Sequence, residues 1–252
     1  MRCSLHGARP HGGAPRSATD CPRGTHLRFI PRHPLKRGDL REMKGYGSSV
    51  TVTRGDIDAS TFEQLAQTQL IAVDTETAGL SWRDDHLALC QLYAPGIDPV
   101  LVQVGTDRAE RLCRLLADPS IIKVLHFAPF DLHFLYASWR VEVRSIACTK
   151  TASRLLWPTL PPADHSLQSL LARQLGIRVE KGSVRTSDWT GELTPAQVEY
   201  ATDDVRHLPQ LFSTLQTQLQ DNDLWQTFRA VCDYLPVAAR LDVEGYPDPL
   251  VY

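Results

Sequence analysis

The stretch Ile71-Ala-Val-Asp74-Thr-Glu76-Thr77-Ala-Gly79-Leu80 places two carboxylates at the end of a short apolar run. The run from residue 70 to residue 74 has the length of a buried strand, and side chains alternate between the two faces of a strand. Asp74 and Glu76 therefore share one face, with their backbones roughly 6–7 Å apart. Like charges at this spacing repel unless a cation lies between them, and Mg²⁺ and Mn²⁺ prefer oxygen ligands. Two solvated carboxylates in a loop after a strand would give the same pattern.

Strand and helix patterns continue on both sides of this segment. Ser60 and Glu63 have the spacing of a capping box, which predicts a helix start. From residue 145 onward the sequence predicts almost only helix. The α/β fold expected from this order is a mixed β-sheet flanked by helices on both faces. The further strands are expected at 48–53, 86–93, 99–104 and 121–125, and the helices at 60–69, 108–117, 130–137, 166–175 and 194–219.

Two later segments carry further acidic residues at element ends. Asp131 follows the strand 121–125, next to Pro129 in the first turn of a helix, where a lone Asp is usually a partner of the helix dipole. Thr194 and Pro195 predict a second helix start, and Tyr200 and Asp204 lie four residues apart on one face of that helix. Taken alone, the Asp131 segment is more typical of ordinary helix structure, and Tyr200 could simply be a core residue of an amphipathic helix with its hydroxyl at the surface.

Composition limits the class of protein. The chain has 252 residues, 42% of them hydrophobic and 22% charged, as in soluble globular proteins. No apolar run approaches the roughly 18 residues of a membrane span, so no membrane partner is expected. Residues 1–44 carry ten Arg and Lys against three Asp and Glu, whereas residues 45–252 carry seventeen against twenty-six. An acidic body of this kind would need bound metal ions or a local basic loop to attract nucleic acid.

The distribution of charge and composition along the chain also suggests the domain boundaries. Residues 1–44 are rich in Arg, Pro, Gly and His and are expected to be a disordered basic tail or the product of a mis-assigned start, with Met43 as the alternative start. A transit peptide and a nucleic-acid-binding arm are the other interpretations. The main domain is expected at 45–220, and residues 221–252 are expected to form closing helices. Six cysteines without zinc spacing or a secretory signal predict reduced thiols and a cytoplasmic location, or an organellar one if the tail is a transit peptide.

Taken together, the three acidic segments resemble a known family. Asp74-Thr-Glu76, Phe130-Asp131 and Tyr200-x-x-x-Asp204 resemble the three exonuclease motifs of the DEDD superfamily, and Tyr200 is typical of its DEDDy branch. The segment from Leu175 to Trp189 resembles the stretch before the third motif in the ribonuclease D family. The resemblance covers residues 48–215 and implies a ribonuclease H-like fold in the main domain. The HRDC domain of ribonuclease D proper is not expected in residues 221–252.

The resemblance also implies a cofactor and roles for the site residues. It implies two divalent metal ions, Mg²⁺ or Mn²⁺, held by the four carboxylates. Asp74 would bridge the ions, Glu76 and Asp204 would complete the site of the ion that binds the attacking water, and Asp131 would hold the second ion. Tyr200 would orient the water, because an ordinary tyrosine pKa near 10 leaves the hydroxyl protonated at neutral pH.

Contacts to the substrate are expected from six further residues, and each has an ordinary structural alternative. Leu80 resembles the residue that wedges between the last two bases in this superfamily, but a leucine is often in the core. The family often has Asn where this chain has Phe127, which puts one substrate contact in doubt. The predicted nucleic-acid-binding residues are Thr77, Leu80, His126, Phe130, Lys181 and Arg185.

The function implied is a metal-dependent 3′→5′ exonuclease that acts on the 3′ end of single-stranded RNA. The same fold acting on single-stranded DNA is one alternative. A catalytically dead nucleic-acid-binding module is another, although a dead member would be expected to lose at least one of the carboxylates that this chain keeps. The choice between RNA and DNA depends on contacts near the 2′-hydroxyl, and no single residue decides it.

Overall fold

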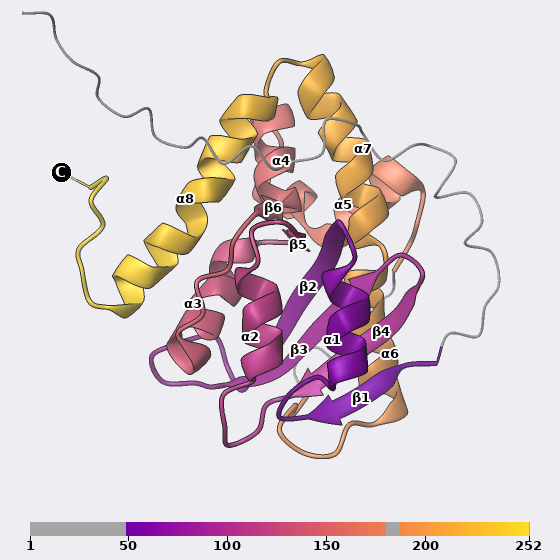
Figure 1. The fold of residues 1–252 in the computed structure, drawn as a ribbon. Helices are drawn as coiled ribbons and strands as arrows, with labels where there is room; N and C mark the ends of the chain where they lie inside the picture. Colours follow the sequence, from indigo (N-terminus) through magenta and orange to yellow (C-terminus); the bar gives the residue numbers. More distant parts are fainter. Residues whose placement is uncertain (1–48, 180–186, 252) are drawn as a thin grey trace, which may run out of the picture.

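The computed structural model describes residues 49–179 and 187–251 and contains a six-stranded sheet with helices on both faces (Figure 1). The order of the strands across the sheet is β1-β4-β3-β2-β5-β6. β3 is antiparallel to β2 and β4, and the remaining neighbours are parallel. The predicted α/β class with a mixed sheet is therefore confirmed. The strands are β1 (Thr51–Arg54), β2 (Leu70–Thr77), β3 (Leu87–Ala94), β4 (Ile97–Gln103), β5 (Ile122–Leu125) and β6 (Ile146–Cys148).

The helices cover the sheet in two layers (Figure 1). α1 (Ala59–Ala66), α2 (Glu110–Ala117) and α3 (Ala128–Trp139) lie on one face. On the other face, α6 (Pro195–Arg206) packs across β2, β3 and β4. α7 (Leu208–Asp221) contacts β2 and β5, and α8 (Trp225–Val243) packs along α3. The remaining elements are α4 (Thr149–Leu156), a short 3₁₀ helix (Pro162–His165) and α5 (Leu167–Leu175).

The structure differs from the sequence prediction at three places. Helix α1 begins one residue before Ser60, because the Asp58 carboxylate accepts a 2.6 Å hydrogen bond from the Thr61 backbone N–H and is the N-cap. The stretch after residue 145 begins with strand β6, which was expected to be helical. The helix expected at 194–219 is two helices, which meet at His207.

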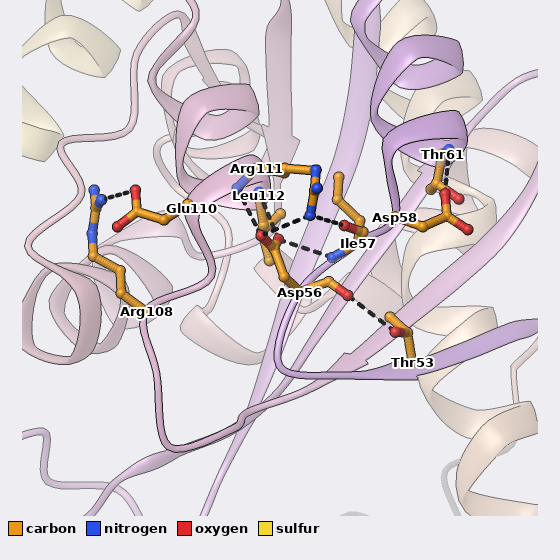
Figure 2. A network of polar contacts seen from close by, with 9 residues as sticks. All are labelled: Thr53, Asp56, Ile57, Asp58, Thr61, Arg108, Glu110, Arg111 and Leu112. Carbon is orange, nitrogen blue, oxygen red and sulfur yellow. Dashed lines mark hydrogen bonds and ion pairs between the residues drawn. The ribbon is translucent and has the colours of Figure 1, made fainter.

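One carboxylate joins the first strand to the second helix of its layer. Figure 2 shows Asp56, in the turn after β1, accepting backbone hydrogen bonds at 2.8 Å from Arg111 and at 3.0 Å from Leu112. These N–H groups belong to the first turn of α2, whose own N-cap residue, Ala109, provides no side-chain acceptor. Asp56 therefore caps α2 from a distant segment and fixes the edge of the sheet that carries β1.

The interior contains two clusters of buried apolar side chains. The larger cluster joins the sheet to most of the helices, and the smaller one joins β3 and β4 to α6 through Leu89, Leu101, Trp189 and Ala201. Within the described ranges, no helix combines the length and the apolar composition that a membrane crossing needs.

Parallel pairing brings three strand ends to one edge of the sheet. β2 pairs with β5 in the register Ala72↔Val124, and β5 pairs with β6 in the register Leu125↔Cys148. Because these three strands run in the same direction, the segments that follow them leave the sheet at the same edge. This edge carries the carboxylates of β2 and the first turn of α3.

Candidate active site

Three of the four predicted carboxylates meet at the end of β2. Asp74 and Glu76 come from this strand and share one face of the sheet. Asp204 comes from α6, which packs on that face of the sheet. Each offers an oxygen atom, and these oxygens all lie within 4.8 Å of one another. The strand period explains why the first two share a face, and the packing of α6 on β2 and β3 supplies the third.

Asp131 lies close to this cluster but makes a different contact. It is 2% exposed in the first turn of α3, and its Oδ1 accepts a 2.6 Å hydrogen bond from the Thr75 hydroxyl. Thr75 lies between Asp74 and Glu76, and strand alternation points its side chain to the opposite face. Asp131 therefore meets β2 from the α3 side of the sheet and is not one of the three clustered carboxylates.

Burial changes the ionisation of Asp131. Loss of solvation raises the pKa of its carboxyl to about 7, while hydrogen bonds, of which the one from the Thr75 hydroxyl is the largest, act in the opposite direction. At neutral pH and without a bound cation, this carboxyl is therefore partly protonated. A nearby cation would favour the charged form.

Tyr200 lies one helical turn before Asp204. Its ring is half-buried against Trp189, with ring centroids 5.9 Å apart, and its hydroxyl hydrogen-bonds the Asp204 carboxylate. Burial, and then the negative charges of Asp204 and Glu76, raise the pKa of Tyr200 far above its ordinary value of 10. The hydroxyl is therefore a proton donor at neutral pH. A capping box between Thr194 and Gln197 fixes the start of this helix.

The loop after β2 presents Leu80 to solvent. Leu80 is 86% exposed, so the alternative of a core leucine is wrong. The loop itself is tightly built: the Thr77 hydroxyl donates to the Gly79 carbonyl, and the Ser81 backbone N–H donates a 2.9 Å bond to Asp85. An exposed leucine on an ordered loop beside carboxylates has the placement expected of a substrate contact.

Two of the other predicted contacts, His126 and Phe130, lie just after β5. His126 is half-buried, and its Nδ1 lies 2.9 Å from the Thr149 hydroxyl, which itself donates to the Leu125 carbonyl. Thr149 thus accepts from Nδ1–H, which fixes the His126 tautomer. Phe130 packs on Phe134 with centroids 5.0 Å apart. Lys181 and Arg185 lie outside the described residues.

The sequence interpretation missed two residues at this edge. Phe127 has a left-handed backbone, with φ of 63°, and is 46% exposed. The Lys150 ammonium lies 4.2 Å from the centre of its ring, which is a cation–π contact. The departure from the family pattern at Phe127 was the signal that marked this position. A bulky residue in the left-handed region is uncommon and tends to occur at functional sites.

The donor set of the cluster fits a divalent cation. Three carboxylates with oxygens this close repel one another, and hard cations such as Mg²⁺ take oxygen ligands of this kind. Asp74, Glu76 and Asp204 are the residues that would hold the ion. The end of β2 therefore has the donor set that a divalent cation would need.

Comparisons with known proteins agree with this geometry. Residues 50–220 match the family model described as 3′-5′ exonuclease. Ribonuclease D of Haemophilus influenzae is 29% identical over 171 residues, which cover 66% of this chain and 41% of that protein. The chain thus spans less than half the length of this curated relative.

Solved structures extend the likeness to a whole protein of similar size. NrnC of Brucella melitensis is 30% identical, with a TM-score of 0.73 over 81% of this chain and 99% of that one, and it has been solved with bound Mg²⁺ and bound to pGG. Ribonuclease D of Escherichia coli, at 24% identity and a TM-score of 0.64 over 74% of this chain and 50% of that one, shares the fold. The family model covers most of the chain and includes β2, α3 and α6, which carry the site. The chain belongs to the 3′-5′ exonuclease family and is ribonuclease D-like.

Proposed function

We propose that the protein hydrolyses single-stranded nucleic acid from its 3′ end and that RNA is the preferred substrate. The observation that carries this proposal is the convergence of Asp74, Glu76 and Asp204, whose oxygens lie within 4.8 Å of one another, beside the Tyr200 hydroxyl. The reaction needs an activated water and a stabilised leaving oxygen. The carboxylate cluster would hold the ions that activate the water and stabilise the leaving oxygen, and Tyr200 lies beside this cluster.

The chain's carboxylates would hold two divalent ions. Asp74 would be shared by both ions, Glu76 and Asp204 would complete one site, and Asp131 would contribute to the other from the α3 side. When bound, such ions lower the pKa of water and neutralise the charge of the phosphate. Either Mg²⁺ or Mn²⁺ suits oxygen ligands.

Tyr200 positions the water and does not remove its proton. Its raised pKa keeps the hydroxyl protonated, and its bond to Asp204 fixes the direction of the O–H group. Because this proton is donated to Asp204, the hydroxyl oxygen would hold a water molecule through its lone pairs, and a protonated tyrosine is a poor base. Leu80, exposed on the loop after β2, would contact the terminal bases, and Thr77 at the end of this strand would lie beside them.

There are two alternatives to this function: a 3′-5′ exonuclease that acts on single-stranded DNA, and a catalytically dead binding module. Relatives named ribonuclease D support RNA, but the same site chemistry would serve single-stranded DNA. A dead binding module is disfavoured because all four carboxylates and Tyr200 are retained and three of them converge.

The proposal is tested with matched single-stranded RNA and DNA of identical sequence, each labelled at the 5′ end. We expect a ladder of products shortened one nucleotide at a time with Mg²⁺ or Mn²⁺, faster on RNA, and no products with a chelator. Asp74→Asn should bind the strand and leave it intact. Binding of RNA without degradation in any divalent metal would establish the dead module, and equal or faster degradation of DNA would reject the RNA preference.

A further inference from the structure

A cavity lies beside the loop that carries Leu80. Its volume is about 670 Å³, and it lies between that loop, the end of α3 and the end of α8. We refer to it as the Trp82 cavity. The side chains that give it its chemistry are Trp82, Arg83, Arg140, Asp242 and Tyr246.

The charge of the Trp82 cavity differs from that of the body of the protein. Its lining has two arginines against one acid, Asp242, whereas residues 45–252 have an excess of acidic residues. Arg83 is held by Asp242 at 2.7 Å and lies 4.1 Å over the Trp82 ring. Arg140 is exposed at the C-terminal end of α3, with its guanidinium 5.5 Å from the Tyr136 ring. Planar guanidinium groups are well suited to phosphate.

The aromatic side chains provide a surface for a base. Tyr246 is 59% exposed. Its position is fixed because α8 ends in a Schellman turn: Gly245 has φ of 82°, and the Tyr246 backbone N–H donates to the Leu241 carbonyl at 2.9 Å. A base can stack on an exposed aromatic ring whatever its sequence. The exposed Tyr246 ring and the arginines that line the same cavity match the two halves of a nucleotide.

The Trp82 cavity is also close to the active site. Trp82 follows Leu80 by two residues, so their backbones are at most about 7 Å apart. Its ring stacks on His133 of α3, with centroids 5.8 Å apart, and His133 is held by Asp242 at 3.0 Å. The loop therefore has Leu80 exposed beside the carboxylates and Trp82 with Arg83 in the cavity. This loop therefore connects the end of the strand that carries Asp74 and Glu76 to the lining of the Trp82 cavity.

We propose that the Trp82 cavity is a second nucleotide-binding site, in which Tyr246 stacks on the base and Arg140 with Arg83 binds the phosphate. The nucleotide is either a unit of the substrate strand away from the cleaved end or a free 5′-mononucleotide. The first source rests on the proposed function. In both cases the ligand chemistry is the same, and the contact to Arg83 links the site to the loop that carries Leu80.

The test compares four exposed-site variants. Arg140→Gln removes a cation and Tyr246→Leu removes a ring, whereas Tyr246→Phe keeps the ring. Arg54→Gln, on the edge strand β1 and outside the lining of the Trp82 cavity, is the control for loss of one exposed charge. The probes are a labelled RNA of about twelve nucleotides, a length in the range of single-strand sites, a dinucleotide that is too short to fill both sites, and adenosine 5′-monophosphate as an inhibitor. Melting temperatures check that each variant is folded.

For a strand-bound nucleotide we expect Arg140→Gln to raise KM for the longer RNA by roughly fivefold, the size of one exposed ionic contact. Tyr246→Leu should raise this KM by at least roughly fivefold, because it removes a ring that stacks on a base. In both variants kcat should be unchanged. The slope of log KM against log salt should fall by about 0.7 in Arg140→Gln, since one phosphate contact is lost. Turnover of the dinucleotide by Arg140→Gln and Tyr246→Leu should match wild type. The control variants Tyr246→Phe and Arg54→Gln should match wild type in KM and in salt slope. If inhibition by the mononucleotide is weakened instead, the source is the free nucleotide.

The proposal is overturned if Arg140→Gln and Tyr246→Leu match Arg54→Gln in KM, salt slope and mononucleotide inhibition. Failure of the proposed function would look different, because the wild-type protein would then degrade none of the substrates. In that event, fluorescence anisotropy of the labelled RNA and of a labelled mononucleotide still tests the cavity. Loss of binding in both variants supports it, and unchanged binding rejects it.

Discussion

The Thr75 hydroxyl donates a 2.6 Å hydrogen bond to Oδ1 of Asp131, across 56 residues of sequence. This bond supports the charged form of a carboxyl whose burial raises its pKa to about 7. Burial is the largest influence on the ionisation of Asp131, and the bond from Thr75 is the largest of the hydrogen bonds that oppose it.

Thr75→Val keeps the shape of the side chain and removes the donor. The pKa of Asp131 should rise further, so the acidic limb of the pH–rate profile should move upward by about one pH unit, the value of a hydrogen bond to a charged group. The measurement is the single-turnover rate on a short RNA between pH 5 and pH 9. Thr75→Ser keeps the hydroxyl and should follow wild type. An unmoved acidic limb in Thr75→Val would show that the bond does not set this ionisation.

Tyr200→Phe should be less damaging than Asp74→Ala. The first loses a hydroxyl that orients water, an effect of about 10²–10⁴-fold on rate, and keeps every metal ligand. The second removes the carboxylate that we propose is shared by two ions, so its rate should be lower still and its affinity for Mn²⁺ weaker. Titration of Mn²⁺ into each variant, with rates on a short RNA, separates the two effects. Wild-type metal affinity in Asp74→Ala would contradict the assignment of the metal site.

Leu80→Ala should affect substrate binding without affecting the fold. Because Leu80 is 86% exposed, the free energy of unfolding should change by less than about 0.5 kcal/mol. KM for RNA should rise roughly tenfold, since burying a leucine side chain against a base contributes about 1.5–3 kcal/mol. Urea denaturation and steady-state kinetics on the same samples provide the comparison. A large loss of stability with unchanged KM would assign Leu80 a structural role.

Gly79→Ala should destabilise the loop from which Leu80 projects. A Cβ at residue 79 would lie 2.2 Å from the Asp85 carboxylate, and this side chain is held by the Ser81 backbone N–H. We expect a loss of about 1–3 kcal/mol in urea denaturation, as for overpacking. Gly191→Ala is the matched control, because a Cβ there has no atom within 4 Å among the described residues. Equal stability of the two variants would mean that the loop adjusts freely.

Lys123 should make stability depend on pH in the alkaline range. Its side chain is fully buried in β5, and its ammonium donates to the Ile121 and Asp118 carbonyls. Burial lowers its pKa from 10.5 to about 7, so between these values the unfolded chain binds a proton that the folded protein does not. Stability from this group therefore rises with pH from 7 to about 10, by up to about 1.4 kcal/mol per pH unit.

Lys123→Met removes the titrating group and tests this sign. The difference in unfolding free energy, wild type minus variant, should increase from pH 7 to pH 9 in urea denaturation. The comparison cancels the other titrating groups, which both proteins share. A constant difference would show that Lys123 stays charged in the folded protein.

The sheet was largely predictable from local sequence, because most of its strands are apolar runs that end at turn residues. β6 was not, since it has only three residues and passes directly into α4. Its identity as a strand comes from parallel pairing with β5, which no local pattern records. The start of α1 was misplaced for a related reason: both Asp58 and Ser60 have N-cap side chains, and the backbone geometry selects Asp58.

The site was predictable only in part by physical reasoning. The strand period places Asp74 and Glu76 together, and helix spacing pairs Tyr200 with Asp204. That these two pairs meet depends on how α6 packs on the sheet, and the sequence indicated it only through family resemblance. The bond from Thr75 to Asp131 and the contact of Lys150 with Phe127 join different elements, so they required the structure.

The cluster of Asp74, Glu76 and Asp204 also has a consequence for the folding of the protein. The third carboxylate arrives on a helix that lies 130 residues beyond the first, so α6 can pack on β2 only by bringing like charges together. A divalent cation held there would relieve this repulsion and would bind the assembled cluster far better than an unfolded chain, so by mass action it would stabilise the native state. The conformational stability of the protein would then be thermodynamically linked to the concentration of free divalent cation around it.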